Sequence, residues 1–222
     1  MARVVSFRGV VLCWIVLVSF MATPAVAARK LSKGGHVISF AIRAWCIPRT
    51  ESLLLEHEDR HECVYSMKNG DRAVGVGYDL DDDKETRRSE LSTVLADYDK
   101  VYKGLQCLNT VQISALLALD TRRALDRAAK SVKALDEQCC SVMAVFGDIQ
   151  HSSGKDAFEG NGFQDFIEAV SAKEWKKAGD KLNETSWCND NKERCVSNKA
   201  LIYQGCGGMK PAVITQVINQ KP

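Results

Sequence analysis

The stretch that decides the fold is EDRHECVYSMKNGDRAVGVGY, residues 58–78. Glu58 comes at the end of a predicted helix, and Asn69-Gly70 is a strong signal for a tight β-hairpin turn. The returning strand, predicted over 72–78, contains Gly75 and Gly77, which indicate a bend or a close approach to the backbone. This order predicts one carboxylate at the mouth of a cleft, with a thin β-ribbon as the opposite wall.

The helix before this stretch is predicted to begin at Pro48 and Thr50, because threonine is a good N-cap and proline favours a helix start. Three consecutive leucines, 53–55, are expected to supply its buried stripe. Glu58 lies four residues after the second leucine and three after the third. It should therefore project from the edge of the apolar face.

The rest of the chain reads as mostly helical. An acidic loop is expected at 79–83, a helix at 85–101, and a capping box at 109–112 that opens a long helix. The apolar stretch 134–146 is the expected central helix, 147–162 a glycine-rich loop, and three further helices are expected after residues 163, 175 and 196. The predicted class is α+β and mostly helical, with a small hairpin lobe (about 50–100) packed against a helical lobe (about 105–206) across a cleft.

Residues 1–27 are predicted to form a signal peptide, because two arginines precede a short apolar run and Ala25-Val26-Ala27 has the pattern of a cleavage site. The mature chain, 28–222, is then expected to be a single secreted, extracellular domain with no membrane partner. Loss of Arg3 and Arg8 reduces the 30 basic residues to 28, which balances the 28 acidic residues. A near-zero net charge argues against a nucleic-acid partner.

Cysteine usage agrees with an oxidising compartment. One of the nine cysteines leaves with the signal peptide, and an even number remains, which predicts up to four disulfides whose pairing is open. The eight are Cys46, Cys63, Cys107, Cys139, Cys140, Cys188, Cys195 and Cys206. Cys139 and Cys140 are adjacent and should bond to different partners.

Other site types receive little support from the residues. Asn183 begins a glycosylation sequon, which is meaningful in a secreted chain. His57 and His61 flank Glu58 at a spacing that can bind metal, but we interpret them as surface histidines. We expect no metal and no cofactor.

The order of the predicted elements and several of their residues resemble phage-type lysozymes over roughly residues 53–206. A helix-terminal Glu58 precedes Tyr65 by seven residues, and Gly75-Val76-Gly77 follows a short turn. Near the C-terminus, Trp187 precedes Arg194 by seven residues, as in the family. The resemblance implies a lysozyme fold, with Glu58 as general acid, Arg194 as its partner, and Tyr65, Gly75 and Gly77 as site support lining the substrate cleft.

The chain departs from the family pattern at two positions. The family has an aspartate where this chain has Met67 and a threonine where it has Ala73. An inverting glycosidase needs a second carboxylate to activate water, and neither residue can supply or orient it. Asp71, two residues before Ala73 and on the same face of the hairpin, is the candidate substitute base.

What the resemblance implies is a lysozyme that cleaves the β-1,4 bond between N-acetylmuramic acid and N-acetylglucosamine in bacterial peptidoglycan. Its expected role is defence or digestion, and its expected partner is peptidoglycan or a related polysaccharide, bound by a monomer. Because of Met67 and Ala73, two alternatives stay open. The protein binds peptidoglycan without cleaving it, or it acts as a secreted effector that uses the fold as a scaffold.

Overall fold

A computed structural model describes residues 36–159 and 162–207, with side chains from Arg43 onward. The predicted signal peptide lies outside the described residues. Among them the chain is mostly helical with a small antiparallel sheet, as the sequence predicts, but the sheet has three strands where a two-stranded hairpin was predicted. No helix within the described ranges is long and apolar enough to cross a membrane.

The first helix, α1 (His36–His57), begins well before the predicted start at Pro48 and Thr50, so that prediction is wrong. Thr50 is fully buried inside the helix, where its hydroxyl donates to the Cys46 carbonyl at 3.1 Å instead of capping. The prediction that all three leucines, 53–55, are buried is also wrong. Leu55 is 54% exposed, because three consecutive residues cannot all face one side of a helix.

The sheet consists of β1 (Arg60–Ser66), β2 (Arg72–Val76) and β3 (Tyr78–Asp79) in that order. The predicted hairpin at Asn69-Gly70 joins β1 and β2, but its loop has three residues instead of two. Gly70 donates to the Met67 carbonyl at 3.0 Å and Met67 donates to Asp71 at 2.8 Å, with Gly70 at a φ of 92°.

The predicted single strand 72–78 is wrong, because the chain reverses at 75–77. Val74 pairs with Tyr78 and Ala73 pairs with Asp79, so the segment forms a second, tighter hairpin. Gly75 and Gly77 have φ values of 69° and 65°, which glycine adopts without the strain that a side chain would cause. Gly77 thereby faces the helical part of the molecule.

The predicted helix 85–101 is interrupted. It comprises α2 (Lys84–Thr93) and α3 (Tyr98–Tyr102), with Leu95 between them at a φ of 58° and Asp97 capping α3. The capping box is confirmed: Asn109 and Gln112 bind each other's backbone amides at the start of α4 (Thr110–Ser131).

The central helix is α5 (Cys140–Ser153), preceded by the short turn η1 (Leu135–Glu137). Part of the predicted loop 147–162 therefore belongs to this helix. The close packing of α1 and α4 against α5 requires glycine at 147, because an added Cβ would lie 2.6 Å from Thr50 Cγ2. The remaining helices are α6 (Gln164–Ser171), α7 (Trp175–Asn183), α8 (Ser186–Asp190) and α9 (Lys192–Gln204).

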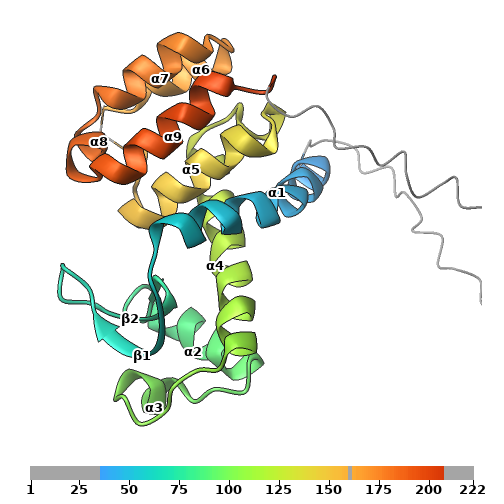
Figure 1. Ribbon diagram of the computed structural model, residues 1–222. Helices are drawn as coiled ribbons and strands as arrows, with labels where there is room; N and C mark the ends of the chain where they lie inside the picture. Colours follow the sequence, from blue (N-terminus) through green and yellow to red (C-terminus); the bar gives the residue numbers. More distant parts are fainter. Residues whose placement is uncertain (1–35, 160–161, 208–222) are drawn as a thin grey trace, which may run out of the picture. The chain divides into compact units, whose positions relative to one another are not determined.

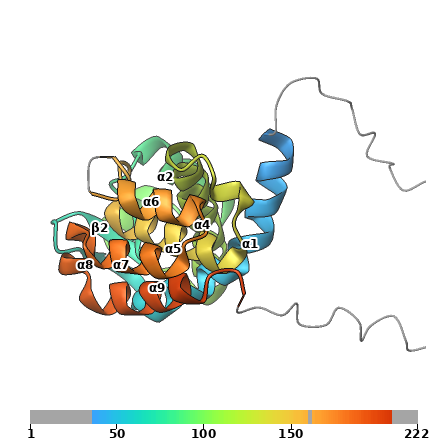
Figure 2. The ribbon, with the colours of Figure 1, turned by 90° about the horizontal axis from the view of Figure 1, so that it is seen from above.

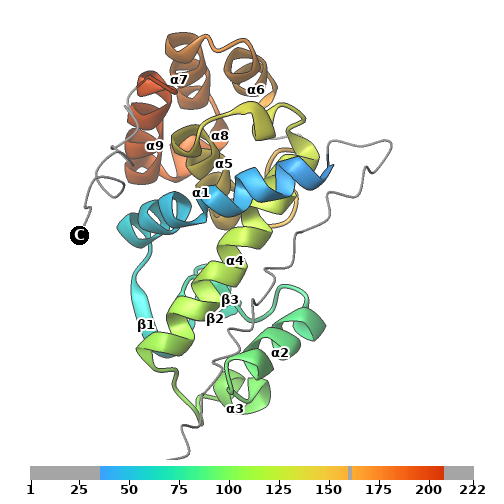
Figure 3. The same cartoon turned by 90° about the vertical axis from the view of Figure 1, so that its right-hand side faces the viewer.

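Two clusters of buried side chains make up the core, and α4 contributes to both. Its first half, with Ile113 and Leu116, packs with the sheet, α2 and α3. Its second half, with Leu125 and Ala128, packs with α5 and the helices around it. Figures 1 and 3 show α4 running from α1 and α5 to the strands, and Figure 2 shows α5 between α1 and the group α6–α9.

The eight cysteines among the described residues are all paired, as predicted, and Cys139 and Cys140 have different partners. The disulfides are Cys46–Cys140, Cys63–Cys107, Cys139–Cys206 and Cys188–Cys195. Several disulfides in one chain indicate an oxidising environment.

Candidate functional site

Glu58 is the first residue after α1, and its amide donates to the Leu54 carbonyl at 2.9 Å. Its carboxylate Oε1 accepts a hydrogen bond from Arg194 Nη2 at 2.6 Å. The side chain of Glu58 is 24% exposed and that of Arg194 is 11% exposed. The structure thus brings together two predicted site residues that are 136 positions apart in the sequence.

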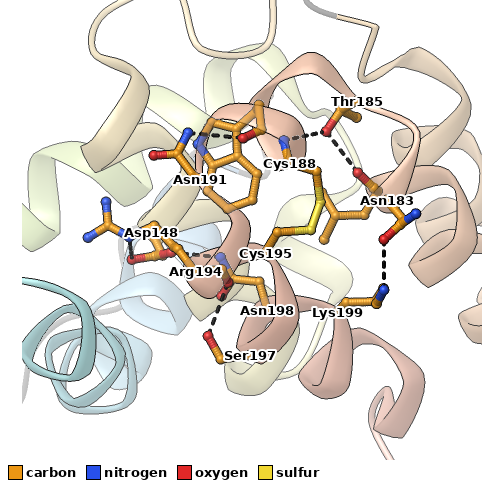
Figure 4. The surroundings of a disulfide bond; sticks show 12 residues. Asp148, Asn183, Thr185, Cys188, Asn191, Arg194, Cys195, Ser197, Asn198 and Lys199 are labelled. Carbon is orange, nitrogen blue, oxygen red and sulfur yellow. Dashed lines mark hydrogen bonds and ion pairs between the residues drawn. A yellow bond between two sulfur atoms is a disulfide. The ribbon is translucent and has the colours of Figure 1, made fainter.

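Arg194 is held in α9 by a buried acid on α5. Asp148 is fully buried, lies 3.5 Å from Arg194 Nε, and accepts a hydrogen bond from Asn198 at 2.6 Å. Next to Arg194, the Cys188–Cys195 disulfide ties α8 to α9 (Figure 4). Asp148 therefore holds the Arg194 guanidinium at Nε, while Nη2 binds Glu58.

The prediction that His57 is a surface histidine is wrong. Its side chain is 8% exposed, with Nδ1 at 3.1 Å from Asp148 and Nε2 at 2.5 Å from Ser197. It therefore supports Asp148 from the end of α1. His61 lies on β1, where its ring packs at 4.1 Å from the ring of Tyr65.

Tyr65 lies on β1 opposite Ala73, with its hydroxyl near Glu58 and the 75–77 turn. Burial raises the pKa of Tyr65, the charge of Glu58 raises it further, and a hydrogen bond with the Gly77 backbone opposes both. The hydroxyl thus stays protonated and can donate a hydrogen bond in the site.

Gly77 is the residue at which the sheet touches the carboxylate. A Cβ added there would lie 2.7 Å from His151 Cε1 and 3.2 Å from Glu58 Cδ. By contrast, a Cβ at Gly75 would make ordinary contact with Ile113 at 3.4 Å. The sequence predicted either a bend or a close backbone approach at these glycines; the structure shows a reversal of the chain at 75–77 and a close approach at Gly77.

We therefore expect Gly77→Ala to impair the site far more than Gly75→Ala, which serves as its matched control. Both substitutions carry the cost of a positive φ, about 1–2 kcal/mol. Gly77→Ala adds overpacking of about 1–3 kcal/mol against His151 and Glu58. Denaturant unfolding of both variants measures the difference, and equal free energies of unfolding would contradict the described approach.

Sequence reasoning missed His151 and Asp120, which lie beside Glu58. His151 Nδ1 is 3.7 Å from Glu58 Oε1, and its Nε2 is 3.3 Å from Asp120 Oδ2. Asp120 also binds Arg87 at 2.7 Å and Arg123 at 2.6 Å. Burial raises the pKa of the Asp120 carboxyl, but contact with His151 and the charge of Arg87 outweigh it and hold the pKa well below its usual range.

Two hollows lie near the Glu58 carboxylate. One, of about 320 Å³, runs between the sheet and the helical lobe and is lined by Asp71, Gly77, Asp79, Asp120 and His151 among others. The other is lined by Glu58 and Arg194 with the α8–α9 turn. Their volumes are in the range of small-molecule sites. Glu58 lines the second hollow and lies next to His151 and Gly77, which line the first.

The two positions that depart from the family pattern lie on the face of the sheet that carries Tyr65. Met67 pairs with Asp71 through the turn hydrogen bond, and Ala73 is fully buried between Tyr65 and Asp79. Asp71 lines the first hollow, as does Asp79, which lies at the end of β3 although an acidic loop was predicted to begin there. The structure therefore offers two carboxylates on this face.

The remaining predicted features lie away from these hollows. Asn183 is exposed at the end of α7, where its side-chain oxygen accepts a hydrogen bond from Lys199 at 2.7 Å. Within residues 36–159 and 162–207, no group of three or more potential ligands is arranged to hold a metal ion.

Comparison with known proteins adds no assignment. No protein-family model matches the chain, and no curated protein shows a significant match to it.

Proposed function

We propose that this protein is a lysozyme-like glycoside hydrolase, secreted, that cleaves the β-1,4 bond between N-acetylmuramic acid and N-acetylglucosamine in peptidoglycan. The observation that carries the proposal is the Glu58 carboxylate, which is partly exposed in the second hollow, bound by Arg194, and next to His151 and Gly77 of the first hollow. The small sheet, the long α4 connection and the central α5 fit a lysozyme-like fold, which we include in the proposal.

The reaction assigns complementary roles to two carboxyl groups. Glu58, protonated, gives its proton to the glycosidic oxygen as the C–O bond breaks. A second carboxylate takes a proton from water, whose oxygen bonds to the sugar carbon. Arg194 returns the Glu58 side chain to the same position after each cycle.

Asp79 fits the second role better than Asp71. Its Oδ1 accepts hydrogen bonds from the amides of Asp81 at 2.8 Å and Asp82 at 3.3 Å, which fixes the carboxylate and leaves Oδ2 for water. Burial raises the pKa of Asp79, the amide of Asp81 lowers it, and the charge of Asp71 raises it, so the pKa lies above its usual value. A higher pKa makes the ionised carboxylate a stronger base.

The site of Asp79 also explains how chemistry can survive the loss of the family's aspartate. Asp79 is the direct neighbour of Ala73 across the sheet, and the charges of Asp79 and Glu58 both act on the Tyr65 hydroxyl. In this proposal, Asp79 on β3 takes the role of the family's aspartate, which Met67 replaces in this chain. Asp71 instead accepts a hydrogen bond from Asn69 at 2.6 Å within its own turn.

We expect Asp79→Asn to reduce hydrolysis by about 10²–10⁴-fold, as loss of a general base does. Asp71→Asn makes the same chemical change on the same face and should keep activity within about threefold. The base must be ionised, so wild-type activity should fall as pH drops through the pKa of Asp79, which burial raises above its usual value. The reverse ranking of the two variants would transfer the base role to Asp71.

The test of the function itself is release of reducing ends from purified, insoluble peptidoglycan by the folded mature protein across a range of pH. Release supports the proposal. Co-sedimentation with the walls without release would overturn it in favour of a peptidoglycan-binding protein, the second candidate, which Met67 and the buried Ala73 favour.

A further inference from the structure

His151 is a buried histidine whose hydrogen-bonding capacity the described residues do not satisfy. Its side chain is 5% exposed, and neither ring nitrogen has a well-aligned hydrogen-bond partner among them. Nearly all buried polar groups are hydrogen-bonded, so an exception requires an explanation. His151 also lines the first hollow, where water or a ligand can reach it.

The surroundings of His151 are dominated by carboxylates. Glu58 lies at 3.7 Å from Nδ1, at the end of α1, and Asp120 lies at 3.3 Å from Nε2, on α4. Arg194 on α9 is the cation that acts against a charged imidazole, while Arg87 and Arg123 are bound to Asp120 on its other side. The 75–77 turn contributes only Gly77, whose missing side chain leaves room for the ring.

We propose that His151 is a positioning residue that returns a proton to Glu58 after each cleavage, in an Asp120–His151–Glu58 relay. The inference rests on the proposed function and extends it. Once Glu58 has given its proton to the leaving oxygen, the imidazolium transfers its Nδ1 proton to the carboxylate. The neutral ring then takes a proton from water in the hollow, while the base, Asp79, releases the proton it took from the attacking water.

The distance to Glu58 excludes His151 as the general base that activates water. A base on the far side of the sugar must leave room for the ring and a water, which separates the two groups by roughly 6.5–9.5 Å. His151 is too close to Glu58 for that. The observed 3.7 Å is longer than a hydrogen bond, so the relay requires this contact to tighten when substrate binds, as catalytic contacts often do.

The neighbouring carboxylates keep the imidazole of His151 protonated. Burial lowers the pKa of His151, but contact with Asp120 and the charges of Asp120 and Glu58 raise it by more, so it lies above its ordinary value. Because the folded-state pKa is raised, the ring remains protonated as pH rises past 6.5, the approximate unperturbed value. It becomes neutral only at higher pH.

His151→Gln tests the relay, because glutamine keeps a hydrogen-bonding amide but cannot carry a proton. The pH profile of kcat for peptidoglycan hydrolysis should lose its alkaline shoulder. We expect the alkaline limb to move down by about one pH unit, with about a tenfold loss at the wild-type optimum. This loss is smaller than the roughly 10²–10⁴-fold effect of removing a direct general acid, because Glu58 remains in place. A uniform loss at all pH values would show a structural role only and overturn the proposal.

A second measurement does not depend on activity or on the folding of that variant. The His151 ring is titrated by NMR in the wild type and in Glu58→Gln, where removal of the neighbouring charge should lower its pKa. An unchanged pKa would overturn the relay. If the wild type shows this coupling between His151 and Glu58 but releases no reducing ends, the proposed hydrolase function is refuted while the His151–Glu58 interaction stands.

Discussion

Glu58→Gln should abolish peptidoglycan hydrolysis, with a loss of about 10²–10⁴-fold that reflects the removal of a general acid. Glutamine has nearly the same shape and can still accept a hydrogen bond from Arg194. It cannot give a proton to the leaving oxygen. The expected change is therefore in kcat, measured as the initial rate of reducing-end release at saturating peptidoglycan.

The structure also predicts that this variant folds. Arg194 retains Asp148 at 3.5 Å, and Asp148 keeps its contacts with His57 and Asn198. Glu85→Gln, the same change at an exposed position in the first turn of α2, is the matched control and should be active. A folded Glu58→Gln protein with more than a tenth of wild-type activity would remove Glu58 from the chemistry.

Removal of the Cys46–Cys140 disulfide should cause the largest loss of stability. This bond joins α1 to the central helix across a sequence separation of 94. In the chain-entropy account, a loop of that length stabilises by about 4–5 kcal/mol. The double variant Cys46→Ala/Cys140→Ala should lose about that much free energy of unfolding in urea, and Cys46 is additionally part of the buried core.

Cys188→Ala/Cys195→Ala is the control within the same chain, because its bond spans a separation of only 7. The same account assigns it about 2 kcal/mol. Its effect should fall on Arg194, the neighbour of Cys195, and so on activity more than on global stability. Equal losses of unfolding free energy in the two double variants would contradict this ranking.

Local sequence signals predicted much of the fold, and tertiary contacts explain where they failed. Asn109 and Gln112 cap α4 because both partners of the motif are close in sequence. The break at Leu95 follows no such signal: the amide of Ala96 turns back to the Leu91 carbonyl, and Gln112 of α4 binds the Val94 carbonyl. The contact between Gln112 and Val94 depends on how α4 packs against α2, and helix propensities contain no information about such packing.

The prediction of a single strand over 72–78 failed for a related reason. A glycine pair inside a strand pattern indicates a bulge, a bend or a close approach, and these have the same sequence signal. What selects the turn is the contact of Gly77 with Glu58 and His151. Those residues are 19 and 74 positions away in the printed sequence.

The site was predictable only in part. Glu58, Tyr65 and Arg194 belong to a spaced pattern, whereas Asp120, Asp148 and His151 look like ordinary polar positions in helices. One signal was present: Asp120 follows the buried Leu116 by four residues and Leu117 by three, which puts a carboxylate on the apolar face. A charge in that position requires a buried partner, and it finds Arg87 and Arg123.

The most direct test of the central claim, that Glu58 delivers a proton to a glycosidic oxygen of peptidoglycan, is analysis of the new sugar ends. Walls digested by the wild type and by Glu58→Gln are treated with borohydride, which converts each reducing end to its alcohol, and the sugars are then separated. The account predicts muramitol from the wild type and none above background from the variant. No muramitol from the folded wild type at any pH, or equal amounts from both proteins, would contradict it.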